Sequence, residues 1–468
     1  MGSVAVWRAG KEFSHAEFRA HISWVKHWLI EQGLDETHPT GIVIVDPYIS
    51  WVVMLALFEL GGVFAVVALE QVGDIRDRLG VRQWIRLDRE PPMTERAWAL
   101  PAKTLLEQRP GEGEVLDALR LDMVATATCW FFTSGTTGTP KTVALDAGRL
   151  QARITPYREA LSAETRALML TGRETLGGFM ISLVTWLQGG MVIFGGTANG
   201  PHAEGALSRC NLISASPAQL LSWLSRFRGQ WPGKEGRCIR SGGARLSLKL
   251  RNELLARACS QIQTTYGSTE LGVVATCDAL LLDQYPGAAG HIYPGAEVEV
   301  VDKEGMTLPP GQEGLLRCRV PGMAEGYLGE TDSATFRGGW FLSGDLGVMH
   351  PDGVLEVIGR TGDVFNLGGV KLSALDLDAR IQAVPGVADG CAVQLNLKGW
   401  PGIGALVVPD KTVPWASLRQ QVAAALKGPY AIKAFPLKAL RRNAMGKIPR
   451  AKLANQLVNA LKKSAKSS

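Results

Sequence analysis

The chain has 468 residues, 46% of them hydrophobic and 20% charged, and a formal net charge of +6. This length exceeds what a single compact core usually holds, so two or more domains are expected. Lysines and arginines are scattered along the sequence rather than gathered in stripes, which gives no reason to expect a nucleic-acid partner. The clearest basic cluster is the C-terminal tail, whose lysines lie beside serines, as in a solvated and frayed end.

The cysteines indicate a reducing compartment. All seven are widely spaced and none forms a CxxC pair, which favours free thiols over a disulfide framework or a zinc site. The first 20 residues carry several charged side chains and lack the apolar stretch of a secretory signal. We therefore expect a cytoplasmic protein.

One segment tests this expectation, because residues 51–69 are almost long and apolar enough to cross a membrane. Glu59 lies in the middle of the segment, and Gly61 and Gly62 weaken a helix directly after it. A strand before the segment and the turn-forming sequence DPYIS favour a strand followed by a buried helix. We expect no membrane span.

The first two thirds of the chain alternate between short apolar runs and helical patterns. This alternation predicts parallel sheets with helices on both faces. The expected elements are a helix at 12–33, a strand at 41–45, a helix at 51–60, a strand at 167–170, a helix at 179–187, strands at 191–194 and 211–215, and a helix at 217–226.

The pattern of expected strands and helices changes twice towards the C-terminus. From about residue 287, short alternating strands separated by Gly, Pro and Asp predict a β-rich subdomain. After residue 361, a small α+β unit is expected, with helices at 373–383, 415–426 and 451–462 and strands at 389–395 and 403–408. We therefore predict an N-terminal domain at 1–361, with the β-rich subdomain at about 287–361, and a C-terminal domain at 362–468.

Residues 131–143, FFTSGTTGTPKTV, form the most distinctive stretch of the sequence. Gly135 and Gly138 let backbone N–H groups approach an anion, the hydroxyls add donors, and Lys141 adds a positive charge, so the loop predicts a phosphate site. A polar loop after a buried strand would be the ordinary alternative. The Walker pattern does not fit, because Pro140 stands where its second glycine is needed.

Further short segments follow in a fixed order: SGGARL at 241–246, TYGSTE at 265–270, SGD at 343–345, GRTGD at 359–363 and RRNAMGKIPR at 441–450. Each alone reads as a turn, a capped helix or a solvated basic loop. Together with TSGTTGTPK, and over essentially the whole chain, they resemble the motifs of the adenylate-forming ligases. That family includes acyl-CoA synthetases, adenylation domains and luciferases.

The resemblance implies a role for each matching residue. ATP or AMP would be bound by Thr133, Ser134, Gly135, Thr136, Thr137, Gly138, Lys141, Gly242, Gly243, Ala244, Tyr266, Gly267, Ser268, Thr269, Asp345 and Arg360. Within this set Tyr266 would stack on adenine, Thr269 would contact the α-phosphate, and Asp345 with Arg360 would hold the ribose. Glu270 would hold Mg²⁺, Lys447 would be catalytic, Gly362 would be the hinge, and Gly369 would line the thiol tunnel.

The resemblance also implies an acid–thiol ligase with a fold of stacked α/β sheets, a β-rich subdomain and a small mobile α+β C-terminal domain. ATP and Mg²⁺ would activate a carboxylic acid as an acyl-adenylate, which would pass to the thiol of coenzyme A or of a carrier-protein phosphopantetheine. The alternatives are an enzyme that stops at the adenylate or uses another acceptor, and a non-catalytic nucleotide-binding relative. The sequence leaves coenzyme A and carrier protein both open.

Three positions depart from the family pattern. Glycine at the hinge, Gly362, widens the accessible backbone conformations, and Asp363 could serve as the pivot instead. Thr264 is shorter than the residue expected beside adenine. The segment 170–181 lacks the Phe-Asp pair of amino-acid-activating domains, which disfavours α-amino acids. Its Gly177, Phe179 and Met180 suit an aryl ring or an apolar chain, the start of a core helix would explain them equally well, and Arg173 is a candidate anchor for a polar group.

Overall fold

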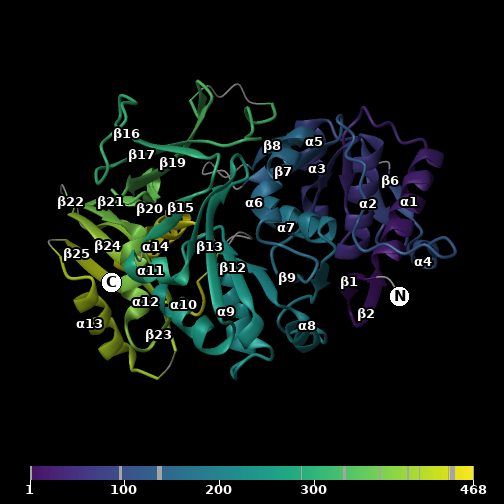
Figure 1. Ribbon diagram of the computed structural model, residues 1–468. Helices are drawn as coiled ribbons and strands as arrows, with labels where there is room; N and C mark the ends of the chain where they lie inside the picture. The colour runs from purple at the N-terminus through teal and green to yellow at the C-terminus, as the bar shows by residue number, and fades with distance from the viewer. Residues whose placement is uncertain are drawn as a thin grey trace.

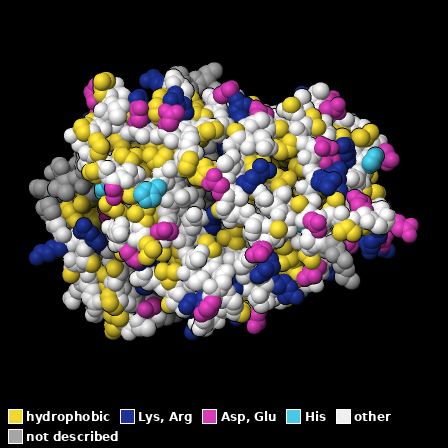
Figure 2. Space-filling view, in the orientation of Figure 1, with side chains coloured by type: hydrophobic (Ala, Val, Ile, Leu, Met, Phe, Trp, Pro, Cys, Tyr) yellow, Lys and Arg dark blue, Asp and Glu magenta, His cyan; other side chains and the backbone are white. Residues whose placement is uncertain are grey.

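The computed structural model describes residues 3–93, 97–133, 140–285, 287–329, 334–367, 370–397, 400–410, 412–428, 430–440, 442 and 448–466. The chain runs from the N-terminal strands and helices at one end of the molecule to the C-terminal unit at the other (Figure 1). Charged side chains of both signs are interspersed over the face drawn in Figure 2, which agrees with the scattered lysines and arginines of the sequence.

A largely parallel sheet forms the N-terminal end and carries the predicted phosphate loop. Its order is β6-β5-β3-β4-β7-β8, and only the outer strand β8 is antiparallel to its neighbour. The strands are β3 (Thr40–Ile42), β4 (Val63–Val66), β5 (Gln83–Leu87), β6 (Ala97–Leu100), β7 (Thr128–Thr133) and β8 (Lys141–Asp146). The helices among them are α2 (Pro47–Leu60), α3 (Val72–Leu79) and α4 (Ala102–Leu106).

A second sheet contains 14 strands in the part of the chain that the structure describes, in the order β16-β17-β19-β20-β15-β14-β13-β12-β11-β9-β10-β1-β2, with β18 beside β19. Its first strands are β1 (Val4–Arg8), β2 (Lys11–Ser14), β9 (Arg166–Met169), β10 (Met191–Phe194), β11 (Leu212–Ala215), β12 (Cys238–Gly242), β13 (Gln261–Ser268) and β14 (Gly272–Asp278). The helices along this part are α1 (His15–Glu31), α5 (Ala147–Ala152), α6 (Thr155–Arg158), α7 (Leu176–Leu187), α8 (Ala203–Arg209), α9 (Pro217–Arg226), α10 (Leu248–Arg257) and α11 (Ala279–Gln284).

The β-rich stretch continues the same sheet. Its strands are β15 (Ala288–Ile292), β16 (Glu297–Val301), β17 (Glu313–Arg319), β18 (Phe336–Arg337), β19 (Trp340–Met349) and β20 (Val354–Arg360), all antiparallel to their neighbours. β15 pairs with both β14 and β20, so main-chain hydrogen bonds run without a break from the α/β part into the β-rich part.

The remaining elements form a C-terminal unit with a core of its own. They are a short 3₁₀ turn η3 (Thr361–Asp363), the hairpin β21 (Val364–Leu367) and β22 (Val370–Ser373), helices α12 (Ala374–Ala383), α13 (Trp415–Ala425) and α14 (Arg450–Lys466), and the sheet β23 (Val387–Leu397), β24 (Trp400–Pro409) and β25 (Ala431–Pro436). One buried cluster joins α12, α13 and the central strand β24 through Leu377, Leu418 and Ile403.

The apolar helices α2 and α7 account for the long hydrophobic segments of the sequence. Both contribute to one core that also contains residues of β1, β4, β7 and β10, and α2 is buried on every side. Such all-round burial explains a helix that is apolar throughout. Glu59 forms an ion pair with Arg19 and lies 3.6 Å from the Lys26 ammonium. Within the described ranges, no helix has both the length and the apolar character needed to span a membrane.

The predicted helix at 12–33 was placed too early. Lys11–Ser14 form β2, and α1 starts at His15 because Ser14 caps it: the Ser14 hydroxyl accepts a hydrogen bond from the Glu17 amide, and the Glu17 carboxylate accepts one from the Ser14 amide. The helix predicted at 51–60 begins earlier, at Pro47, because Asp46 caps it and proline suits a first turn.

Candidate functional site

The segment TYGSTE, at 265–270, covers the end of β13 and the first residues of the turn to β14. Gly267 lies at a bulge, where a Cβ atom would come within 1.9 Å of the Gly272 carbonyl oxygen. Gly272 has a φ of +89°, which an L side chain rarely adopts. Glycine at both positions therefore allows the tight turn that presents Ser268, Thr269 and Glu270.

One side of β13 carries the groups predicted to hold the nucleoside. The Tyr266 hydroxyl donates a hydrogen bond to Oδ2 of Asp345 at 2.7 Å, and the Nε atom of Arg360 lies 3.3 Å from Oδ1. Asp345 and Arg360 face each other in the register of β19 and β20, which explains how residues 15 apart in sequence meet. Burial, and then the charge of Asp345, raise the pKa of Tyr266, so its hydroxyl stays protonated as a donor.

The turn that follows β13 carries a buried carboxylate. Glu270 is 7% exposed, and its Oε1 atom accepts a hydrogen bond from the Tyr327 hydroxyl at 2.7 Å. The Nζ atom of Lys141 lies 4.2 Å from the centre of the Tyr327 ring. Tyr327 therefore connects the lysine at the end of the phosphate loop to the predicted metal ligand, at a distance typical of a cation–π contact.

Arg153 forms hydrogen bonds with the backbone of the turn between β13 and β14. Its guanidinium donates to the carbonyl oxygens of Thr269 at 2.9 Å, Glu270 at 2.7 Å and Gly322 at 2.8 Å. Arg153 is 4% exposed, and burial lowers its pKa to about 10, so it remains a cation at neutral pH. The segment that begins at Gly322 also contains Tyr327, so one arginine positions both partners of the Tyr327–Glu270 bond.

Arg153 and Tyr327 were not predicted from the sequence. Neither belongs to one of the recognised segments, and their contacts join residues 57, 116, 117 and 169 positions apart. No local pattern reveals such contacts.

The donor set suits Mg²⁺ rather than a metal that needs a protein cage. In the described part of the chain, no group of three or more His, Cys, Asp or Glu side chains could hold a metal ion. Mg²⁺ usually takes one or two carboxylates and completes its shell with water and phosphate oxygens. A single buried carboxylate, connected through Tyr327 to a lysine predicted to bind phosphate, therefore fits the predicted role of Glu270.

Several predicted residues lie at strand ends near this centre. Thr133 ends β7 opposite Lys141, and its hydroxyl donates to the Lys141 carbonyl oxygen at 3.4 Å. Gly242 ends β12 next to Thr265 of β13, and Gly243 follows with a φ of +82° before Ala244. Ser134, Gly135, Thr136, Thr137, Gly138, Gly369 and Lys447 lie outside the described residues, so their roles stay predictions.

The residues predicted for the substrate pocket lie at the start of α7. Gly177 is exposed, whereas Phe179 and Met180 are fully buried, and the Phe179 ring stacks on Trp51 of α2 with centroids 5.1 Å apart. Arg173 donates to the Ser50 hydroxyl at 2.7 Å and to the Ile44 carbonyl oxygen at 2.6 Å. These contacts give Arg173 a structural role in holding the β3–α2 connection.

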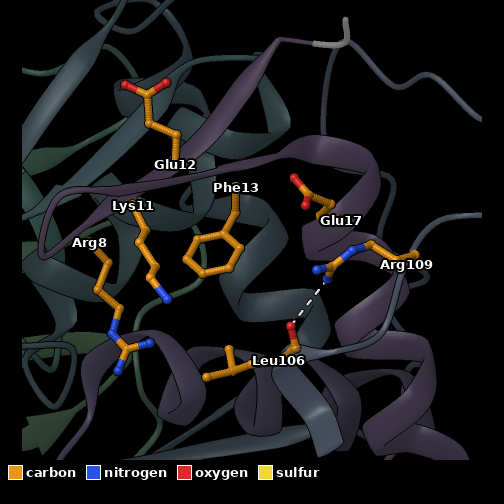
Figure 3. Close-up of a pocket in the computed structure, with 7 residues that line it drawn as sticks. All are labelled: Arg8, Lys11, Glu12, Phe13, Glu17, Leu106 and Arg109. Carbon is orange, nitrogen blue, oxygen red and sulfur yellow. Dashed lines mark hydrogen bonds between the residues drawn. The ribbon is translucent and has the colours of Figure 1, made fainter. Parts of the chain in front are cut away.

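A cavity of about 310 Å³ lies beside β1, β2 and the start of α1 (Figure 3). It is lined by Arg8, Lys11, Glu12, Phe13, Glu17, Leu106 and Arg109. Its charges are largely compensated, because Arg8 pairs with Asp46 outside the cavity and the Glu17 carboxylate caps Ser14. None of the nucleotide-site residues predicted from the sequence lines this cavity.

The chain is similar to known proteins over more than half of its length. The family model described as "AMP-binding enzyme" matches residues 81–328. A 2-hydroxy-7-methoxy-5-methyl-1-naphthoate–CoA ligase of Streptomyces carzinostaticus is 31% identical over 56% of this chain and 49% of its own length, so this match spans about half of that relative. A feruloyl-CoA synthase of an Amycolatopsis species is 28% identical over 70% of this chain and 71% of its own.

A solved structure shares the fold over almost the whole chain. The o-succinylbenzoate coenzyme A synthetase of Bacillus subtilis, in complex with ATP and magnesium ion, superimposes with a TM-score of 0.80. The superposition covers 97% of this chain and 96% of that one at 20% identity, which is a statement about the fold alone. It confirms the expected arrangement of a large α/β part followed by a small α+β unit.

Proposed function

Because the chain belongs to the family of AMP-binding enzymes, we propose that it is an ATP-dependent acid–thiol ligase. It activates a carboxylic acid as an acyl-adenylate and then transfers the acyl group to a thiol. The observation that carries this proposal is the set of groups around the C-terminal end of β13 and the turn that follows: Tyr266 with Asp345 and Arg360, and Glu270 with Tyr327 and Lys141.

Each half of the reaction balances without any further reactant. In the first, a carboxylate oxygen bonds to the α-phosphorus of ATP, the bond from that phosphorus to the bridging oxygen breaks, and pyrophosphate leaves. In the second, the thiol sulfur bonds to the acyl carbon, the bond to AMP breaks, and the thiol proton passes to solvent. The first step joins two anions, so its barrier is largely electrostatic and positional.

The residues divide this work by their chemistry. Asp345 accepts the ribose hydroxyls, with Tyr266 and Arg360 keeping its carboxylate in place. Lys141 and the loop at 133–138 bind the leaving phosphates, and Lys447 bridges the carboxylate and the α-phosphate. Mg²⁺, when bound by Glu270, offsets the charge of the phosphates. Removing one donor to the transition state typically costs on the order of 100-fold to 1000-fold in rate.

The substrate we propose is an aryl or fatty acid rather than an α-amino acid. Two relatives are named for acids that contain an aromatic ring, a naphthoate and a ferulate, and the start of α7 is apolar. Both relatives are named for coenzyme A as the acceptor, which favours coenzyme A here over a carrier-protein phosphopantetheine. Gly369, by resemblance, leaves room for the pantetheine arm that both acceptors share.

The domain organisation and the location form part of the same proposal. A boundary at residues 361 and 362 places the hinge in η3, between the sheet that holds Asp345 and the unit that carries Lys447. A Cβ atom added at Gly362 would meet nothing within 4 Å, so this glycine is not needed to avoid a clash. All seven cysteines are free, which suits a reducing compartment such as the cytoplasm.

Exchange of labelled pyrophosphate into ATP tests the proposal. A panel of aryl and fatty acids is offered one at a time to the wild type and to Lys447→Ala, and thioester formation is then followed with coenzyme A or a phosphopantetheinylated carrier protein. We expect exchange that depends on the acid and is nearly lost in the variant. Full exchange in Lys447→Ala would contradict the catalytic assignment, and no exchange with any acid would favour a non-catalytic relative.

A further inference from the structure

Residues 443–447, predicted from the sequence to be the loop that carries Lys447, have an arginine–aspartate ion pair on each side. Before the loop, Nη2 of Arg442 lies 2.8 and 3.0 Å from the two carboxylate oxygens of Asp389. After it, Nη1 and Nη2 of Arg450 donate to the two oxygens of Asp378 at 3.0 and 2.5 Å. Asp378 belongs to α12 and Asp389 to β23, so both pairs fasten the residues that flank the predicted loop to the C-terminal unit.

The second pair, Asp378 with Arg450, is buried. The side chains of Arg450 and Asp378 are 10% and 9% exposed. The Asp378 carboxylate also accepts the Ala392 amide at 2.7 Å, while Nη1 of Arg450 donates to the Ala392 carbonyl oxygen at 2.7 Å. Burial raises the pKa of the Asp378 carboxyl and the Arg450 guanidinium opposes this effect, so Asp378 depends on its partner to stay charged.

The buried pair also reaches the segment that links the two parts of the chain. Nε of Arg450 lies 3.4 Å from Oδ1 of Asp363, the last residue of η3. One guanidinium thus contacts α12, β23 and the linker at once. The Arg442–Asp389 pair is more exposed, at 20% and 22%, and we expect it to constrain the loop less strongly.

The spacing makes these anchors relevant to the lysine. Lys447 follows Arg442 by five residues and precedes Arg450 by three, so the extended chain can carry it at most about 18 Å from the first anchor and about 11 Å from the second. The reaction needs the ammonium at a defined place, and a misplacement of about 1 Å costs about 100-fold in rate.

We propose that Asp378, acting through Arg450, and Asp389, acting through Arg442, are positioning residues that hold the Lys447 loop for adenylation. This inference rests on the proposed function, which assigns Lys447 to that step. It predicts a specific defect: ATP binding, which the proposed function assigns to residues of the two N-terminal sheets, stays intact, while the adenylation rate falls.

A double-mutant cycle in the full-length protein tests the proposal. Asp378→Asn is made in the wild type and in Lys447→Ala, and the single-turnover rate of adenylation is measured with an acid that supports exchange. We expect a drop of about 10-fold to 100-fold in the wild-type background with KM for ATP unchanged, and less than about 3-fold in the Lys447→Ala background. Arg450→Met should repeat this pattern, and Arg450→Lys should restore part of the rate.

Arg380→Met is the matched control, because it removes an exposed arginine from α12 without touching the loop anchors. It should leave the rate unchanged. If Asp378→Asn lowered the adenylation rate equally in both backgrounds, its effect would not act through Lys447, and the proposal would be overturned. An unchanged rate in both backgrounds would overturn it as well. If the buried variants fail to fold, Arg442→Met at the exposed anchor carries the same cycle, with a smaller expected drop.

The cycle also separates this inference from the proposed function. If Lys447→Ala loses adenylation but Asp378→Asn acts independently of it, the anchoring proposal fails and the function stands. If Lys447→Ala adenylates at the wild-type rate, the catalytic assignment fails and the anchoring proposal is overturned with it. A synthetic acyl-adenylate supplied with the thiol gives a further readout, because the thioester step should be spared in Asp378→Asn.

Discussion

The Tyr327 hydroxyl offers a sharp test of how the metal ligand is held. Tyr327→Phe removes the 2.7 Å hydrogen bond to Glu270 and keeps the ring over which Lys141 lies. Glu270 is 7% exposed, so solvent can replace the lost donor only in part. A hydrogen bond to a charged group contributes about 1.5–3 kcal/mol. Loss of a residue that orients a metal ligand typically lowers metal affinity or activity by about 10-fold to 100-fold.

We therefore expect Tyr327→Phe to lower kcat/KM for Mg²⁺–ATP in the adenylation step by about 10-fold to 100-fold. The assay is pyrophosphate exchange at a fixed acid concentration, titrated with Mg²⁺, and the variant should need more Mg²⁺ to reach half of its maximal rate. Tyr327→Leu should lose more, because it also removes the cation–π contact, which contributes about 0.5–2 kcal/mol.

The control is Tyr285→Phe. It removes a bond of the same kind, from the Tyr285 hydroxyl to Asp352 at 2.8 Å, at an exposed position away from the site. Its kinetics should match the wild type. A Tyr327→Phe enzyme with an unchanged Mg²⁺ dependence would refute the reasoning, and so would an equal loss in both variants.

Three further predictions concern the same framework. Gly267→Ala should abolish adenylation and lower the melting temperature, because its Cβ atom would meet the Gly272 carbonyl oxygen at 1.9 Å; wild-type kinetics would contradict this. Arg153→Lys should lower adenylation at least about 10-fold, because one ammonium cannot reproduce the three bonds of the guanidinium, and unchanged rates would argue against a positioning role. Burial lowers the pKa of His21 to about 4, so its contribution to stability is complete above pH 6.5 and is lost as the pH falls towards 4. Between pH 6.5 and pH 4, the free energy of unfolding measured in urea should fall less for His21→Gln than for the wild type. It should fall as much for His27→Gln, at an exposed position, as for the wild type.

The elements predicted best were those whose boundaries are written locally. The helix at 217–226 was placed correctly at both ends, where Ser216 caps it, Pro217 opens it and Phe227 leaves the helical conformation. Strand β1 was missed because its partner lies far away: Val6 pairs with Val192 of β10. A five-residue strand at the N-terminus carries no local sign of such a partner.

The same distinction applies to the site. Four site residues lie in short segments that could be recognised along the chain: Tyr266, Glu270, Asp345 and Arg360. In the structure, Tyr266 forms a hydrogen bond with Asp345. Arg153 and the Asp378–Arg450 pair act through contacts between distant segments. Buried ion pairs of this kind become visible only after the fold has brought their partners together.

Transfer of heavy oxygen from the acid to AMP tests the central claim most directly. A carboxylic acid that supports pyrophosphate exchange is labelled in both carboxylate oxygens and converted with ATP and coenzyme A, and the products are weighed by mass spectrometry. If the carboxylate attacks the α-phosphorus, AMP must keep one labelled oxygen when the thiol displaces it, and the thioester must keep the other. Unlabelled AMP, or label in a phosphate released with ADP, would contradict the acyl-adenylate mechanism proposed for this chain.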